Sequence, residues 1–83
     1  MKMKPFPTPH FSCSDLYLAA YLIAKGLRLV DVDKADSKRA VFVFSDVVGR
    51  EDTVASFWSK EARIEPRAFI AAIKEAKERL YSD

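Results

Sequence analysis

Cys13 and His10 are the residues whose types and spacing come closest to nucleophilic chemistry in this sequence. A thiol in the first turn of a helix is acidified by the helix dipole, and a nearby histidine can act as its base. A catalytic histidine also needs a third group to orient it. His10 follows a segment with prolines at positions 5, 7 and 9, and such a segment does not predict a fixed position for the imidazole ring. We therefore interpret Cys13 as a small residue at the start of a helix and predict that the protein is not an enzyme.

Metal and cofactor sites have little support in the sequence. One histidine and one cysteine cannot complete the four-ligand set of a structural zinc site without several carboxylates. The segment from Asp31 resembles the start of a calcium loop, but its sixth position lacks glycine and Phe42 stands at its twelfth, where a glutamate is needed. The two glycines, Gly26 and Gly49, form no phosphate-binding motif. We predict no metal and no cofactor.

Four cations near the C-terminus form a candidate nucleic-acid surface, made up of Arg63, Arg67, Lys74 and Lys77. The last three fall within about 80° of one another on a predicted helix, beside Ile70 and Tyr81. Glu78 lies in the same sector and dilutes the positive charge. The net charge of +2 permits nucleic-acid contact without arguing for it. A solvated helix face therefore stays open as the other interpretation.

The central structural element of the sequence is the run Leu16 to Ala24, in which nine consecutive residues carry no charge. Ser12 and Asp15 have the spacing of a capping box, which predicts a helix start at Ser12. Lys25 and Gly26 are typical of a helix end with a left-handed glycine. The sequence therefore predicts a helix over about 13–25.

A β-hairpin is predicted next, from strands over 27–32 and 39–45 joined by a charged loop within 31–38. Phe42 and Phe44 alternate with Val41 and Val43, so both faces of the second strand are apolar. Helices are predicted over about 51–60, with Gly49 or Asp52 as cap, and over 66–81, with a short strand at Ile64 between them. We expect Phe42 and Phe44 to face the helices.

These elements give one α+β domain of order α-β-β-α-α, with an antiparallel hairpin packed on helices. A chain of 83 residues has room for one such core. We predict an extended, proline-containing arm over residues 1–10 and the domain over residues 11–83.

The excess apolar surface on the first helix and the hairpin points to a protein partner. The candidate interface residues are Tyr17, Tyr21, Val41 and Val43. Tyrosines with an apolar body and a polar tip suit such an interface, and hairpin edges can pair with another chain. We predict an interaction module that associates with a partner or with itself as a homodimer. Cover supplied by the other two helices, and nucleic-acid binding through the basic helix face, are the alternatives.

The expected location is the cytoplasm. A single cysteine excludes an intrachain disulfide and favours a reducing compartment. The first residues lack the apolar segment of a signal peptide, and the apolar run at 16–24 is far shorter than the roughly 20 residues that span a bilayer. We expect no membrane partner.

Three stretches together resemble a known family: FSCSDLYLAAYLIAKGLRL, RAVFVFSD and PRAFIAAIKEAKERLY. They are similar to small bacterial and phage-borne domains of unknown function, which share a Ser-Asp start, a helix ending in Lys-Gly, an F-V-F strand and a last helix ending in Leu-Tyr. The resemblance covers about residues 11–81. It implies an α/β module in a mobile-element setting, and it implies no catalytic residue because its motifs are caps and core positions.

Overall fold

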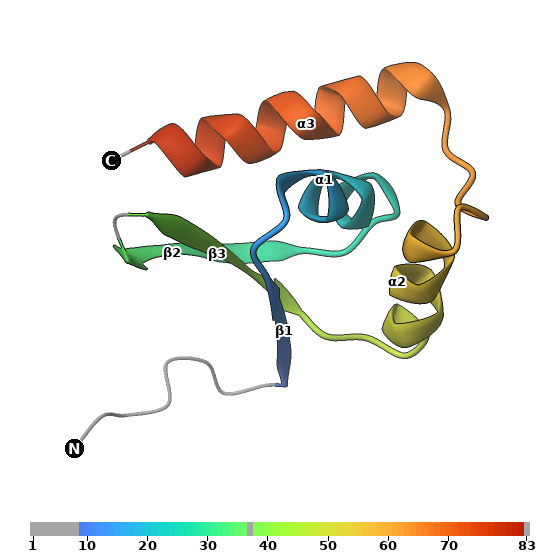
Figure 1. The fold of residues 1–83 in the computed structure, drawn as a ribbon, viewed down its shortest axis with the longest axis horizontal. Helices are drawn as coiled ribbons and strands as arrows, with labels where there is room; N and C mark the ends of the chain where they lie inside the picture. Colours follow the sequence, from blue (N-terminus) through green and yellow to red (C-terminus); the bar gives the residue numbers. More distant parts are fainter. Residues whose placement is uncertain (1–8, 37, 83) are drawn as a thin grey trace.

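The computed structural model describes residues 9–36 and 38–82, and it shows a three-stranded sheet with three helices (Figure 1). In chain order the elements are β1 (His10–Cys13), α1 (Leu16–Ala24), β2 (Leu29–Asp36), β3 (Arg39–Ser45), α2 (Arg50–Trp58) and α3 (Pro66–Tyr81). The predicted α+β class and antiparallel hairpin are confirmed. Of the predicted arm, residues 1–8 lie outside the described residues, and His10 belongs to β1.

Strand β3 is the centre of the sheet, which has the order β1-β3-β2 with antiparallel pairing on both sides. Phe44 stands in register between Phe11 of β1 and Leu29 of β2. Two residues earlier on β3, Phe42 stands in register between Cys13 of β1 and Val32 of β2. Because side chains opposite one another share a face, these two rows form the apolar floor of the core.

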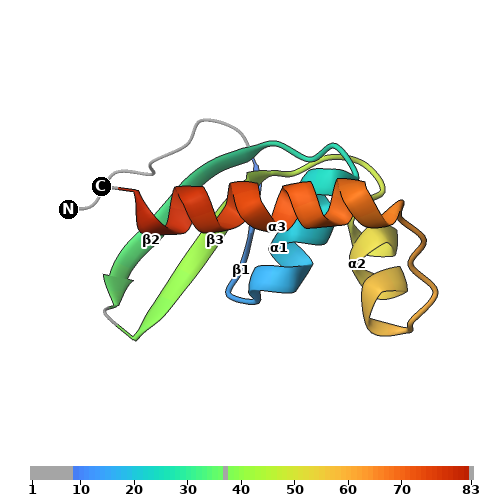
Figure 2. The same ribbon diagram turned by 90° about the horizontal axis from the view of Figure 1, so that it is seen from above.

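Helix α1 lies between this floor and helix α3 (Figure 1), and the view from above shows α3 crossing over α1 (Figure 2). Five consecutive residues, Leu18 to Leu22, are at most 3% exposed, and the core joins Leu18, Ala19 and Leu22 of α1 to Ala76 of α3. Alanines at these contacts let the two helices approach closely. A helix that is apolar nearly all round is thus covered on most sides within one domain.

The start of α1 differs from the prediction. Asp15, not Ser12, is the N-cap: its carboxylate accepts hydrogen bonds from the backbone N–H groups of Tyr17 at 2.8 Å and Leu18 at 3.0 Å. Ser12 lies in β1, paired with Val43. The helix therefore begins at Leu16 rather than 13, because pairing with β3 takes the backbone that a longer helix would need.

The end of α1 is as predicted. Gly26 has φ +99°, and its N–H donates to the Ile23 carbonyl oxygen, while the N–H of Leu27 donates to that of Leu22. These two bonds are the pair expected of a Schellman motif. They turn the chain directly into β2.

Removing the cap at Asp15 tests this assignment. Asp15→Ala is expected to lower the free energy of unfolding by about 1 kcal/mol, because two backbone donors lose their acceptor. Ser12→Ala is the matched control, and it should change stability by less than about 0.5 kcal/mol. Urea denaturation followed by circular dichroism measures both. A larger loss at Ser12 than at Asp15 would contradict the observed helix start.

The hairpin and the later helices also refine the prediction. β2 runs to Asp36, so much of the predicted 31–38 loop is strand, with irregular register at two points. Ile64 is not in a strand; the third strand is β1.

Gly49, at φ +93°, is the N-cap of α2, which is one of the two residues predicted for that position. Helix α3 has the predicted bounds, and the Glu65 carboxylate caps it by accepting the Ala68 N–H at 2.8 Å.

Candidate nucleic-acid interface

The outer side of α3 carries a continuous stripe of cations and apolar side chains. We call it the α3 stripe; it consists of Arg67, Ile70, Lys74, Lys77 and Tyr81, all exposed. Successive members are three or four residues apart, so they line up along a helix of 3.6 residues per turn. The buried residues Ala72 and Ala76 lie on the other side of the helix. None of the stripe's cations forms an ion pair with a described residue.

At its C-terminal end the stripe meets the tip of the β2–β3 hairpin. The Nζ of Lys34 donates to the carbonyl oxygen of Leu80 at 3.1 Å and also to that of Ser82. Figure 1 shows the end of α3 lying over the hairpin. A cation at a helix C-terminus is favourable because it satisfies carbonyls that have no partner within the helix. This contact joins two segments that lie more than forty residues apart in sequence.

A hollow of about 430 Å³ lies at this junction. Its lining comprises Lys34, Asp36, Lys38, Arg39, Ala40, Leu80 and Tyr81. The hairpin thus adds three cations, Lys34, Lys38 and Arg39, beside the end of the stripe. We call these the hairpin cations, and the stripe and the hairpin cations together the basic face. Arg39 also donates from Nε to the hydroxyl of Ser14 at 3.0 Å.

The structure thus brings together three of the four predicted nucleic-acid residues, Arg67, Lys74 and Lys77. Arg63 is exposed in the loop before α3, at the other end of the helix from the hairpin. The hairpin cations were missed because the prediction placed most of them in a loop. Only the pairing of β2 with β3 and the docking of α3 bring them beside Tyr81.

The predicted protein-interface residues are scattered rather than gathered. Tyr17 is 53% exposed, whereas Tyr21 is 3% exposed. The Tyr21 ring packs on Phe57 of α2 at 5.5 Å between centroids, and its hydroxyl bonds to that of Ser56 at 3.2 Å. Val41 is half-buried and Val43 is 7% exposed, both on the opposite sheet face from Phe42. The tyrosine pair is therefore divided between the surface and the α1–α2 contact.

Cys13 lies in strand β1, before the helix, and not in the first helical turn as predicted. Burial raises the pKa of its thiol to about 11, and the nearby Asp15 carboxylate adds to this, although a hydrogen bond to the Asp15 carbonyl acts the other way. The thiol is therefore protonated near neutral pH. A protonated, half-buried thiol is a weak nucleophile, which favours the interpretation of Cys13 as a packing residue.

This pKa shift predicts a stability change at high pH. The folded state holds the Cys13 proton more tightly than the unfolded chain, so stability is unaffected below about pH 9 and falls as the pH rises toward 11. Because the side chain is half-exposed, we expect a loss of only about 1 kcal/mol. Urea titrations at pH 8 and pH 10.5 measure it. The difference should shrink in Cys13→Ala, and an unchanged pH dependence in that variant would contradict the assignment.

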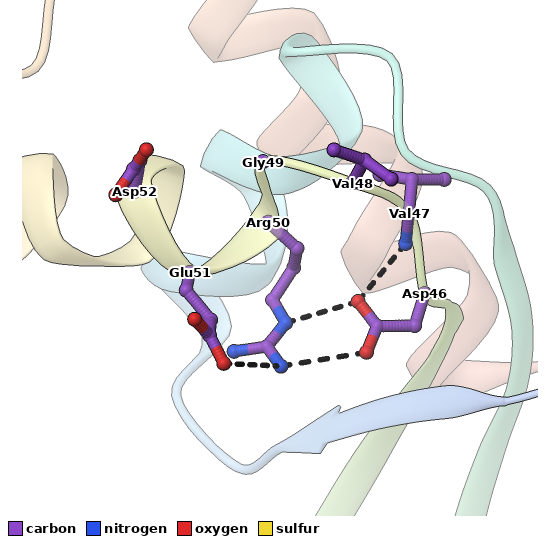
Figure 3. A pocket seen from close by; sticks show the side chains of 7 residues that line it. All are labelled: Asp46, Val47, Val48, Gly49, Arg50, Glu51 and Asp52. Carbon is purple, nitrogen blue, oxygen red and sulfur yellow. Dashed lines mark hydrogen bonds and ion pairs between the residues drawn. The ribbon is translucent and has the colours of Figure 1, made fainter.

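A second hollow, of about 250 Å³, lies where β3 leads into α2, and Figure 3 shows its lining from Asp46 to Asp52. The guanidinium of Arg50 bonds to the Asp46 carboxylate at 3.0 Å and lies 4.3 Å from the centre of the Phe11 ring. The hydrogen bond from Arg50 lowers the pKa of Asp46, and Asp46 in turn raises the pKa of Arg50. We interpret this arrangement as structural, since it ties the α2 start to strand β1.

The described residues contain neither a cluster of metal ligands nor a membrane-spanning helix. In residues 9–36 and 38–82 no three histidine, cysteine, aspartate or glutamate side chains come together as metal ligands would. Asp33 and Asp36, of the calcium-like segment, each accept a backbone N–H two residues on, at 2.9 Å. No helix within those residues has the length and apolar character needed to cross a bilayer.

Comparison with known proteins identifies the family. The sequence matches DUF5659, a domain of unknown function, over residues 9–82. The chain belongs to the DUF5659 family. The match begins at the residue before β1 and ends just after α3, so it takes in every element of the fold. The resemblance to a small domain family of unknown function is thus confirmed. No curated protein and no solved structure matches the chain.

Proposed function

We propose that this DUF5659 domain is a non-enzymatic nucleic-acid-binding protein that contacts phosphates through the basic face. The observation that carries the proposal is that the three hairpin cations lie beside the C-terminal end of α3, along which the three exposed cations of the stripe extend, in a domain whose net charge is only +2. Concentrated positive charge is the electrostatic footprint of such proteins. Asp36 lines the hollow and Glu78 lies in the same sector of α3; the other carboxylates of the two segments are Asp31 and Asp33 of β2 and Glu75 of α3.

Exposed apolar side chains interleave with these cations, which also favours nucleic acid. Ile70 is 52% exposed and Tyr81 is 75% exposed, and both lie in the α3 stripe. Side chains of this kind can contact sugars and bases while the lysines and the arginines hold phosphates. A helix face that is only solvated does not require these exposed apolar side chains.

The apolar surface that favoured self-association is largely used inside the domain. Leu18 to Leu22 of α1 are buried, so that helix leaves little apolar area for a partner. The edge strand β2 carries Asp31, Asp33 and Asp36, and like charges on an edge oppose pairing with a second copy. This is why we rank nucleic-acid binding above the interaction module.

The direct test is the salt dependence of binding. Anisotropy of a fluorescein-labelled 20-nucleotide DNA, single-stranded or duplex, is titrated with the protein from 50 to 300 mM NaCl. We expect log Kd to rise linearly with log salt, with a slope of about 2–5, because three to six phosphate contacts release counterions. A flat response, or no binding at 50 mM, would overturn the proposal.

Self-association stays a second proposal, and the exposed Trp58 favours it. This ring is 58% exposed and stands edge-on to Phe57 at 5.0 Å between centroids. Aromatic rings that are left in water are typical anchors of protein interfaces. Light scattering from micromolar to millimolar concentration tests it: a dimer that Trp58→Ala abolishes supports the proposal, and a monomer throughout overturns it.

The setting belongs to the same proposal. A single cysteine and the predicted resemblance to bacterial and phage-borne domains support a bacterial cytoplasm, where nucleic acid is abundant and thiols stay reduced. The mobile-element context rests on that resemblance alone.

A further inference from the structure

We infer that the hollow at Tyr81 is a stacking site for one base of a single-stranded nucleic acid. This inference rests on the proposed function and gives it a substrate class. Tyr81 is the last residue of α3, its side chain is 75% exposed, and it lines the hollow together with Lys34, Lys38 and Arg39. An aromatic ring next to cations is the combination on which single strands are bound, since every base offers a π-face and every nucleotide a phosphate.

The backbone on either side of Tyr81 is fixed. Lys34 donates to the carbonyl oxygens of Leu80 and Ser82, the two residues on either side of Tyr81. The hydroxyl of Ser82 donates to the Arg79 carbonyl oxygen at 3.1 Å. The guanidinium of Arg79 in turn donates to the Leu29 carbonyl of β2 at 3.2 Å. A helix end held to the sheet in this way presents the ring at a fixed place, so little backbone entropy is lost when a base stacks on it.

The positions of the other cations fit a strand that leads away from the hollow. Lys77 precedes Tyr81 by about one helical turn, roughly 6 Å along the axis, and Lys74 and Arg67 follow at roughly 10 and 21 Å. A single strand can place successive phosphates near these side chains while one base enters the hollow. Leu80 and Ala40, both half-buried, supply an apolar floor.

A duplex fits this arrangement less well. Its bases are stacked on one another, so a side chain at the surface reaches their faces only after a base has been unstacked. Asp36, which also lines the hollow, repels phosphate, so it favours a base rather than a phosphate at the centre. An acidic protein segment would gain from the cations but would leave the exposed ring without a stacking partner.

The experiment compares Tyr81→Ala and Tyr81→Phe with the wild-type protein. Binding of fluorescein-labelled dT12 and of a 12-base-pair duplex is measured by anisotropy at 50 mM NaCl. We expect dT12 to bind more tightly than the duplex, and Tyr81→Ala to weaken dT12 binding about 5- to 150-fold. Tyr81→Phe should stay within about threefold, because stacking needs the ring and not the hydroxyl. Unchanged urea midpoints show that both variants are folded, as the exposure of Tyr81 leads us to expect.

Each other outcome is decisive. If neither DNA binds the wild-type protein, the proposed function fails and the inference with it. If both bind and Tyr81→Ala leaves dT12 affinity unchanged, or duplex is preferred, the inference alone is overturned. Equal loss in Tyr81→Phe would show a hydroxyl hydrogen bond in place of stacking and would also overturn it. If polyglutamate competes with dT12 at equal charge concentration, the hollow is a site for acidic protein and the inference is overturned.

Discussion

Phe44→Ala is expected to lower the free energy of unfolding by about 3–5 kcal/mol, which is among the largest stability effects expected in this domain. The Phe44 ring is 0% exposed and stands between Phe11 and Leu29 on the floor of the core, under helix α1. Its removal loses apolar burial and leaves a cavity that its neighbours on three elements cannot readily fill. A domain of 83 residues has a total stability of only about 4–12 kcal/mol. The variant should therefore be near its unfolding threshold at room temperature.

The matched control is Val41→Ala on the same strand. Val41 is half-buried and lies on the other face of β3, away from α1, so its truncation should cost about 1 kcal/mol or less. Urea denaturation of both variants is followed by circular dichroism at 222 nm. Equal losses for the two variants would contradict a core that lies on one face of the sheet.

Much of this core could be predicted from local sequence. The alternation of Phe42 and Phe44 in β3, the bounds of α3 and the glycine ending of α1 are each determined by residues within a few positions. In such segments the period of the apolar residues and the capping chemistry agree, and tertiary contacts have no reason to override them.

Strand β1 could not be predicted in this way. Ser12, Ser14 and Asp15 are all favourable N-caps within four residues, so capping chemistry alone leaves the helix start open. The choice is made by β3, which pairs with residues 10–13 from a point more than twenty-five residues further along the chain. Four residues next to a proline-rich segment give too short a pattern to reveal this pairing.

The charged half of β2 was not predicted as a strand, for a different reason. Asp31 and Asp33 are turn-forming residues, and their spacing suggested a loop. In the structure they alternate with Val30 and Val32 in a strand at the sheet edge, where charges protect against unwanted pairing. This misassignment also hid Lys34 from the predicted basic surface. The α3 stripe, by contrast, needed only helical periodicity.

Neutralising the α3 stripe is expected to have the largest effect on the proposed activity. The triple variant Arg67→Gln, Lys74→Gln and Lys77→Gln should weaken binding of single-stranded DNA about 100- to 500-fold at 0.1 M salt. Each lost phosphate contact also removes about 0.7–0.9 from the salt slope, so the slope should fall by about 2–3. Because all three side chains are exposed and form no ion pair with a described residue, stability should change by less than about 1 kcal/mol.

A second triple variant separates the position of the charges from their number. Lys25→Gln, Arg28→Gln and Lys60→Gln remove three exposed cations that lie outside the basic face, and the formal net charge falls from +2 to −1, as in the first variant. If DNA is bound on the basic face, this variant should lose less than about tenfold in affinity and keep most of its salt slope, since only long-range attraction is weakened. Equal losses in the two triple variants would mean that overall charge, and not the stripe on α3, governs the interaction.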